Sequence, residues 1–392
     1  MFLAVLVLGA CSAPRRNPVP KDLAATAAVA GMPTVRFWGD TADASLLARY
    51  MLSLEREVKA AGVGSIAELP DAHFLALSGG GSDGAFGAGL LCGWTERGDR
   101  PTFKIVTGIS TGALIAPFAF AGPEYDHVLR DVYTNISTRD IVHQRSILGT
   151  LTSDAATDVE PLRALVAKYV DQAFIDKVAE ESRRGRLLFI GTTNMDAQRP
   201  SMWAMGAIAA SGHPDSIQLF RDIMIASASI PAVFPPVMIE VQGADGKMYD
   251  EMHCDGGVTS QVFLYPASFS FNDLPDQAAA TRKRHVYVIR NAQLSASHKK
   301  IDRSIFPIAG RAISTLIKTQ GVGDLYRIYL GTQRDGLEYN LAYIPESFTL
   351  DSKEAFDPEY MRPLFQLGFD LAKEGYPWAK APPGFEPPRA GE

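Results

Sequence analysis

The 392-residue sequence predicts an α/β fold in one compact unit. Two segments, 74–91 and 103–120, each have the pattern of a buried strand, a glycine-containing turn and an apolar helix. A third, strand-like segment at 248–252 leads to Asp-Gly-Gly at 255–257. Hydrophobic residues make up 46% of the chain, which supports a large core. Because these segments are spread over the first two thirds of the chain and have to converge, we expect them to share one domain.

The first turn, Ser-Gly-Gly-Gly-Ser-Asp-Gly at 78–84, presents several backbone N–H groups at the start of a helix and therefore predicts an anion-binding site. Its glycines Gly79, Gly81 and Gly84 satisfy the dinucleotide pattern G-x-G-x-x-G, but that site also needs a carboxylate at the end of the next strand. The next strand leads instead to Ser110. The turn therefore favours the oxyanion of an ester's tetrahedral intermediate, with a purely structural tight turn as the alternative.

The second turn, Gly108-Ile-Ser110-Thr-Gly112, has the pattern of a nucleophile elbow. In such a turn, strained backbone angles push the serine hydroxyl clear of the sheet, and the glycines let neighbouring backbone pass closely. The strand-like run before it contains no Gly or Pro, and an apolar helix-like run follows it. Ser110 is therefore the candidate nucleophile.

The third motif offers two candidate bases for that serine, His253 and Asp255. Histidine is the more frequent base, but residues i and i+2 of an extended segment share a face, so the two side chains cannot easily form an end-to-end relay to one serine. Asp255 is followed by Gly256 and Gly257 in a sharp turn where backbone can approach closely, and it is the better candidate. An ordinary turn is the alternative interpretation of Asp-Gly-Gly.

The three motifs, in this order, resemble those of the patatin-like phospholipase family. Two further segments resemble the family as well, Ile-Gly-Thr-Thr-Asn-Met-Asp at 190–196 and the proline-rich run at 226–236. The resemblance spans roughly 73–265. It implies a three-layer α/β/α fold with a central, mostly parallel sheet, a nucleophile elbow and a helical insertion, for which 124–184 is the candidate.

The resemblance implies a serine acyl hydrolase that cleaves lipid or phospholipid esters through a Ser110–Asp255 dyad and an acyl-enzyme, without metal or cofactor. Backbone amides around Gly80, Gly81 and Asp83 are expected to bind the oxyanion. Supporting roles fall to the glycines of the three motifs: Gly79, Gly84, Gly108, Gly112, Gly256 and Gly257. Asp83 departs from the family pattern, which has Arg or Lys there. We expect its carboxylate to turn outward or to cap the following helix, because a carboxylate beside the oxyanion would oppose the reaction.

The N-terminus predicts export and a lipid anchor. Residues 2–10 form an apolar run that is too short to span a bilayer but suits the core of a signal peptide. The run ends in Leu-Gly-Ala-Cys11, which resembles the bacterial lipobox, in which the cysteine is acylated; an ordinary secretory peptide is the alternative. Ser12 favours the periplasmic face of the outer membrane within the bacterial cell envelope. Residues 12–31 have the composition of a tether.

The predicted domain organisation follows from these motifs: a signal peptide at 1–10, a tether and N-terminal segment at 11–70, the catalytic core at 71–268, and a C-terminal extension at 269–392 packed on the same domain. The extension includes a strand at 285–291, an amphipathic helix at 305–318 and a strand near 341. A net charge of −6 argues against nucleic-acid binding and against a membrane held by basic residues. We expect Cys92 and Cys254 to be buried free thiols.

Two other functions remain open at this level. One is an α/β-hydrolase esterase with a Ser-Asp-His triad, in which His285 or His298 supplies the histidine. The other is a non-catalytic lipoprotein that uses the same fold to bind lipid, an interpretation for which Asp83 is the best support.

Overall fold

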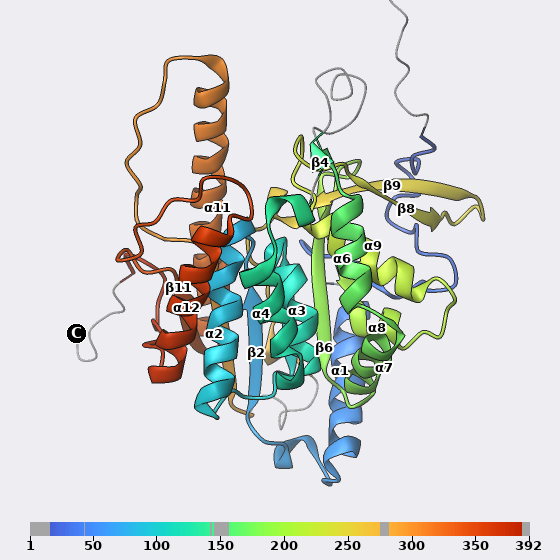
Figure 1. Cartoon of the computed structure of the whole chain (residues 1–392). Helices are drawn as coiled ribbons and strands as arrows, with labels where there is room; N and C mark the ends of the chain where they lie inside the picture. Colours follow the sequence, from blue (N-terminus) through green and yellow to red (C-terminus); the bar gives the residue numbers. More distant parts are fainter. Residues whose placement is uncertain (1–15, 43, 142, 145–156, 275–281, 386–392) are drawn as a thin grey trace, which may run out of the picture.

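The computed structural model describes residues 16–42, 44–141, 143–144, 157–274 and 282–385. The predicted signal peptide and Cys11 therefore lie outside the described residues. The described chain has an α/β/α architecture, in which helices cover both faces of a central sheet (Figure 1). Its strands are β1 Arg36–Trp38, β2 Ala72–Leu77, β3 Ile105–Ile109, β4 His143–Gln144, β5 Thr157–Asp158, β6 Leu187–Asn194, β7 Arg199–Ala204, β8 Val237–Gln242, β9 Met248–Asp255, β10 Arg284–Arg290 and β11 Glu338–Tyr343. Its helices are α1 Ala44–Ala61, α2 Gly84–Arg97, α3 Thr111–Ala121, α4 Asp126–Asn135, α6 Glu160–Tyr169, α7 Gln172–Arg183, α8 Met205–Ala209, α9 Ser216–Ala228, α11 Ile305–Asp335 and α12 Pro358–Glu374.

The main sheet has the strand order β1-β7-β6-β3-β2-β10-β11, and β9 also pairs with β6 and carries β8. The five strands β6, β3, β2, β10 and β11 are parallel, whereas β7, β1, β9 and β8 pair antiparallel. The carboxyl ends of the parallel strands therefore meet at one edge, which is where α/β proteins place their ligand sites. The motifs at 78–84, 108–112 and 255–257 all follow strands that end at this edge.

Two hydrophobic cores lie on the two faces of the sheet. The first is formed with α2, α3, α4, α6, α7, α9 and α12, and the second with α1, the C-terminal part of α11 and the segment 262–274. Strand β2 is buried on both faces: Leu75 and Leu77 contribute to the first core, and Phe74 and Ala76 to the second. This burial explains why the central strands read as continuous apolar runs in the sequence. The helical insertion predicted at 124–184 contains α4, α6 and α7.

The helices α2 and α12 pack through glycines. A side chain at Gly93 of α2 would place its Cβ 2.1 Å from the carbonyl oxygen of Phe369, and one at Gly368 of α12 would come within 2.3 Å of the carbonyl oxygen of Phe86. The two backbones are therefore in direct contact. Because α2 begins at the 78–84 turn, this contact ties α12 to the edge of the sheet that carries the motifs.

The N-terminal segment differs from the expected tether, because residues 16–31 pack on the domain. Arg16 pairs with Asp196 at 2.7 Å and with Asp250 at 2.8 Å, so that two carboxylates hold one guanidinium. The proline- and alanine-rich composition suggested a tether. Composition cannot predict these ion pairs, because the partners of Arg16 lie 180 or more residues away in sequence.

The helix predicted at 305–318 is also longer than expected. The expected helix at 305–318 is the first part of α11, which continues to Asp335 and packs its second part on the body. The strands predicted at 285–291 and near 341 are present as β10 and β11, and both belong to the parallel part of the sheet. Within the described ranges, no helix is both long enough and apolar enough to cross a lipid bilayer.

The glycine contact between α2 and α12 should contribute to the free energy of unfolding. Gly93→Val should lower the free energy of unfolding by about 3 kcal/mol, because the added side chain meets backbone atoms that cannot move aside without separating the helices. Gly323→Ala in α11 is the matched control, since no atom lies within 4 Å of its added Cβ, and it should change stability by no more than about 1 kcal/mol. Urea unfolding of both variants measures the difference. Equal losses would contradict the packing described.

Candidate active site

Ser110 sits on the turn between β3 and α3 with φ 54° and ψ −124°, a left-handed conformation that is rare for a residue with a side chain. The turn is tight because two glycines admit close backbone. A Cβ at Gly108 would lie 2.4 Å from the carbonyl oxygen of Gly112, and a Cβ at Gly112 would lie 2.3 Å from that of Leu77. The Ser110 amide donates to the hydroxyl of Ser227 at 3.0 Å, which helps to hold the strained conformation. The structure therefore forms the nucleophile elbow that the sequence predicts.

Ser110 and Asp255 are brought into direct contact although 145 residues separate them. The Ser110 hydroxyl donates a hydrogen bond to Oδ2 of Asp255 at 2.7 Å, and the Gly257 amide donates to Oδ1 at 2.7 Å. Strand β9 places Asp255 opposite Thr192 of β6, next to the end of β3. Both side chains are buried, with 7% of Ser110 and 5% of Asp255 exposed.

The glycine-rich turn lies against Ser110. The Cβ position of Gly79 is 3.1 Å from Cβ of Ser110, and the Gly79 amide donates to the carbonyl of Gln261 at 2.9 Å. Gly81 has φ 58°, so the turn needs a residue that adopts left-handed backbone freely. Three sequence-predicted motifs therefore form one site at the carboxyl edge of the sheet.

A family model described as patatin-like phospholipase matches residues 75–268. The chain carries a patatin-like phospholipase domain. The match covers the glycine-rich turn, the elbow and the Asp-Gly-Gly motif, and it agrees with the resemblance inferred from these motifs. The strands β10 and β11 and the helix α12 lie beyond the matched residues.

Similar solved structures include VipD from Legionella pneumophila, at 13% identity and a TM-score of 0.36, and human GIVD cytosolic phospholipase A2, at 11% identity and a TM-score of 0.32. The two alignments cover 78% and 86% of this chain. The chain spans 66% of the length of the first structure and 64% of the second, which is less than two thirds of each. A comparison with curated protein sequences gave no match.

The surroundings of Asp255 in the patatin-like domain change its acidity. Burial raises the pKa of Asp255 to about 6, against the opposing effect of the hydrogen bonds from Ser110 and Gly257. A carboxylate with a raised pKa is a stronger proton acceptor than an ordinary aspartate. The hydrogen bond and the raised pKa of Asp255 together suit transfer of a proton from the Ser110 hydroxyl to the carboxylate.

The structure adds two residues to the site that the sequence did not suggest, Arg290 and Asn291 at the end of β10. Asn291 donates from its backbone to the Ser78 hydroxyl at 2.8 Å and from its side chain to the Ser78 carbonyl at 2.9 Å. Its side-chain oxygen also accepts from the amide of Gly87 at 3.1 Å. These bonds fix the glycine-rich turn at both ends.

Arg290 places a buried positive charge directly beneath the turn. Its Nη1 donates to the Gly79 carbonyl at 3.0 Å and to the Ser78 hydroxyl at 3.1 Å, and only 3% of the residue is exposed. Burial lowers the pKa of Arg290 to about 10, and the nearby carboxylates of Asp83 and Asp324 oppose that shift. The site therefore contains a cation although its glycine-rich turn has none.

The bonding of the turn also decides which amides are available to an anion. The Asp83 amide donates to the Gly80 carbonyl at 3.1 Å, so the expected role of Asp83 as an oxyanion donor is not supported. Within the described part of the chain, the N–H groups of Gly80 and Gly81 have no hydrogen-bond acceptor. The Gly80 N–H shares a planar peptide with the Gly79 carbonyl and points the opposite way. Because Arg290 holds that carbonyl, it also fixes the direction of the Gly80 N–H.

Asp83 itself is half-buried and accepts a hydrogen bond from the hydroxyl of Tyr360 on α12 at 2.6 Å. It makes no side-chain cap to α2, so the expected capping role is wrong, and it does not point freely to solvent either. Burial raises the pKa of Asp83 to about 6, while the Tyr360 hydroxyl and the charge of Arg290 lower it. The carboxylate is thus turned toward α12.

The histidines do not complete a triad. His253 is fully buried, and its ring nitrogens bond to Thr192 at 2.9 Å and to Glu251 at 3.1 Å. His285 begins β10 at the amino-terminal edge of the sheet, where it pairs with Asp71 and Glu338. Among the residues that the structure describes, including His298, no histidine bonds to Ser110 or Asp255.

Other sequence expectations concern thiols and metals. Cys92 and Cys254 are buried free cysteines, as expected, and burial raises the pKa of each thiol to about 12. In the described ranges, no group of three or more His, Cys, Asp or Glu side chains is arranged to hold a metal ion.

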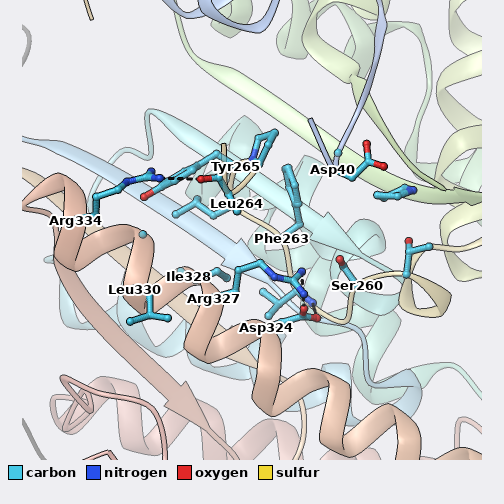
Figure 2. Close-up of a pocket in the computed structure, with 17 residues that line it drawn as sticks. Asp40, Ser260, Phe263, Leu264, Tyr265, Asp324, Arg327, Ile328, Leu330 and Arg334 are labelled. Atoms are coloured by element: carbon cyan, nitrogen blue, oxygen red, sulfur yellow. Dashed lines mark hydrogen bonds and ion pairs between the residues drawn. The ribbon is translucent and has the colours of Figure 1, made fainter. Parts of the chain in front are cut away.

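A cavity of about 570 Å³ lies beside the segment 259–267 and the second part of α11. Figure 2 shows Asp324, Arg327 and Ser260 at one end of it and Arg334 at the other. Neither Ser110 nor Asp255 lines this cavity, so its size is no indication that it holds the reacting group.

Proposed function

We propose that the protein hydrolyses carboxylic esters of lipids, with Ser110 as the nucleophile and Asp255 as the base. The observation that carries this proposal is the 2.7 Å hydrogen bond from the Ser110 hydroxyl to a buried carboxylate whose pKa is raised to about 6. The patatin-like phospholipase domain supports a lipid ester as the substrate class.

In the first half of the proposed reaction, Asp255 accepts the proton of the Ser110 hydroxyl while the serine oxygen attacks the ester carbonyl. The carbonyl oxygen becomes an oxyanion. When the tetrahedral intermediate collapses, the bond to the alcohol breaks, and the alcohol leaves with the proton from Asp255. Ser110 then carries the acyl group as an ester.

In the second half, water attacks the acyl-enzyme and gives a proton to Asp255. Collapse of this second intermediate releases the fatty acid, and the proton returns to the Ser110 oxygen. No metal or cofactor takes part in either step. The Gly257 amide keeps Asp255 oriented throughout, because it donates to the carboxylate oxygen that does not face Ser110.

We further propose that the N–H groups of Gly80 and Gly81 bind the oxyanion, with Arg290 as a positioning residue. Arg290 contacts the carbonyl side of the Gly79–Gly80 peptide, so its charge strengthens the N–H of the same peptide as a donor and keeps it aimed in one direction. In this way Arg290 takes the place of the basic residue that the family pattern has at position 83.

The place of action is proposed from the N-terminal sequence. A lipid anchor on Cys11 holds the protein on the periplasmic face of the bacterial outer membrane, where phospholipid is the available ester. Arg16, the first described residue, supports this arrangement, because its partner Asp196 lies just beyond the carboxyl end of β6. The described chain therefore begins at the same edge of the sheet as Ser110.

The proposal is tested first by removing each member of the pair. Ser110→Ala and Asp255→Asn should each lower kcat on a short-chain ester by about 10³-fold or more, and the double variant should be no worse than either single variant, because both remove the same step. Thermal unfolding should stay close to that of the unmodified protein.

Two outcomes count against the dyad. If the unmodified, folded protein neither turns over an ester nor reacts with a fluorophosphonate at Ser110, the domain is a non-catalytic lipid-binding module. If Asp255→Asn keeps near-normal activity while His285→Ala or His298→Ala abolishes it, a triad operates instead.

The raised pKa of Asp255 predicts a pH dependence. Only the ionised carboxylate accepts a proton, so kcat/KM should fall about tenfold per pH unit as the pH drops below about 6 and should level off above it. Asp83 also has a pKa raised to about 6, so Asp83→Asn is the matched control. In this variant, kcat/KM should still fall below about pH 6. If the fall disappears in Asp83→Asn, the titrating group is Asp83, and the assignment to Asp255 is wrong.

The role given to Arg290 predicts a loss of rate beyond any loss of stability. Arg290→Gln should lower kcat about 10- to 100-fold with little change in KM, because the charge beneath the oxyanion amides is removed. Arg282→Gln is the control. Arg282 is also buried, lies just before the other end of β10 and pairs with Glu57, so its loss should lower the melting temperature without changing kcat. Unchanged kcat in folded Arg290→Gln would refute the positioning role.

A further inference from the structure

The first part of α11, residues 305–318, projects beyond the body of the molecule (Figure 1, upper left). Its large apolar side chains are exposed to an unusual degree. The exposed fractions are 75% for Ile305, 57% for Ile313 and 69% for Leu316, and Ile308 and Ile317 are exposed as well. We call residues 305–318 the outer half of α11. At 1.5 Å per residue it is about 20 Å long.

The exposed apolar residues occupy one side of this helix. Together with Ala309 and Ala312 they recur every three or four residues, at 305, 308–309, 312–313 and 316–317. Arg311, Ser314 and Lys318 follow the same spacing on the opposite side. Such a pattern normally marks a helix that packs on a protein core, but in this structure the apolar side faces outward.

The outer half of α11 ends next to the candidate active site. Gln320, two residues after its end, contacts the side chain of Gln261 and the backbone of Val258. Gln261 in turn accepts the Gly79 amide of the glycine-rich turn, and Val258 lies three residues after Asp255 and is 47% exposed. The apolar side chains therefore continue from the rim of the site along the projecting helix.

Two more exposed apolar residues lie on the same rim. Ile230 follows Ser229, whose carbonyl accepts the amide of Asp255 at 2.8 Å, and Val233 lies one turn further. Ile230 is 39% exposed and Val233 42% exposed. The carboxyl edge of the sheet thus presents apolar side chains on more than one element around a buried nucleophile.

The charge around the projecting helix is opposite in sign to that of the whole protein. The chain has a net charge of −6. Between 299 and 318, however, it has one acidic residue, Asp302, and five basic ones: Lys299, Lys300, Arg303, Arg311 and Lys318. A helix with one apolar side and a basic polar side is the pattern of segments that lie in the interface of an anionic lipid membrane.

We propose that the outer half of α11 docks the protein onto an anionic phospholipid surface, with its apolar side in the lipid and the basic residues beside the head groups. Docking brings the rim formed by Ile230, Val233 and Val258 to the same surface and places Ser110 next to its substrate. The benefit to catalysis rests on the proposed function; the docking itself does not.

The same observations argue against a second copy of this chain as the occupant. In a dimer joined through the apolar sides, the basic residues on the opposite side of each helix would stay in solvent and gain no acidic partner. An anionic lipid surface satisfies both the apolar side and the positive charge.

The test uses the full-length protein with Cys11→Ser, so that no acyl chain contributes to binding, and compares variants that share this N-terminus. Ile305→Gln, Ile313→Gln and Leu316→Gln are combined in one variant, because glutamine keeps helix propensity while removing apolar surface. Sedimentation with vesicles of phosphatidylcholine containing phosphatidylglycerol measures binding. We expect the triple variant to bind at least about tenfold more weakly. Leu330→Gln, which changes an exposed leucine on the packed part of the same helix, should bind normally.

A second variant tests the charge. Lys299→Gln, Lys300→Gln and Arg303→Gln together should weaken binding to vesicles containing phosphatidylglycerol and leave the weaker binding to pure phosphatidylcholine unchanged. Added salt should weaken the binding of the unmodified protein in the same way.

Hydrolysis separates the docking proposal from the proposed function. The triple variant should hydrolyse vesicle phospholipid at least about tenfold more slowly but a short soluble ester within about twofold of normal. Ser110→Ala should bind vesicles normally. If the unmodified protein binds vesicles but hydrolyses nothing, the proposed function fails and the docking stands. If the triple variant binds vesicles normally, or if it only converts a dimer to a monomer, the docking proposal is overturned.

Discussion

The active site depends on a close contact between two backbone turns at the carboxyl ends of β2 and β3. Gly112 of the elbow lies so near the carbonyl of Leu77 that no side chain fits between them, and the Cβ position of Gly79 lies 3.1 Å from Cβ of Ser110. This contact sets the distance between Ser110 and the amides of Gly80 and Gly81. In the proposed reaction, donors held in place in this way need little rearrangement.

The parts of the site that the sequence predicted are those encoded in a few consecutive residues. The elbow around Ser110 and the turn after Asp255 need particular glycines at fixed positions, so their patterns are visible locally. Arg290 and Asn291 were missed because they reach the turn only through the pairing of β10 with β2, more than 200 residues apart in sequence. Nothing in a single sequence reports which strands are neighbours in a sheet.

The predictions for single elements failed where tertiary contacts decide the outcome. Residues 16–31 have the composition of a tether, but Arg16 is held by two carboxylates. Asp83 was expected to turn outward or to cap α2, but it bonds to Tyr360. The helix α11 was predicted only as far as 318. Glycines at 321 and 323 interrupt the pattern there, yet the helix continues, because its second part packs on β10 and β11 and the segment 262–274.

The dependence of the glycine-rich turn on β10 has a consequence for the timing of activity. A chain leaving the ribosome exposes Ser110 and Asp255 before Arg290 and Asn291 have been made, and β2 lacks its second neighbour until that point. Domains fold during synthesis from the N-terminus as their partners appear. A nascent chain therefore has an unfixed turn and an incomplete sheet until residues 284–291 have been made, so the candidate site is among the last parts of the domain to be completed.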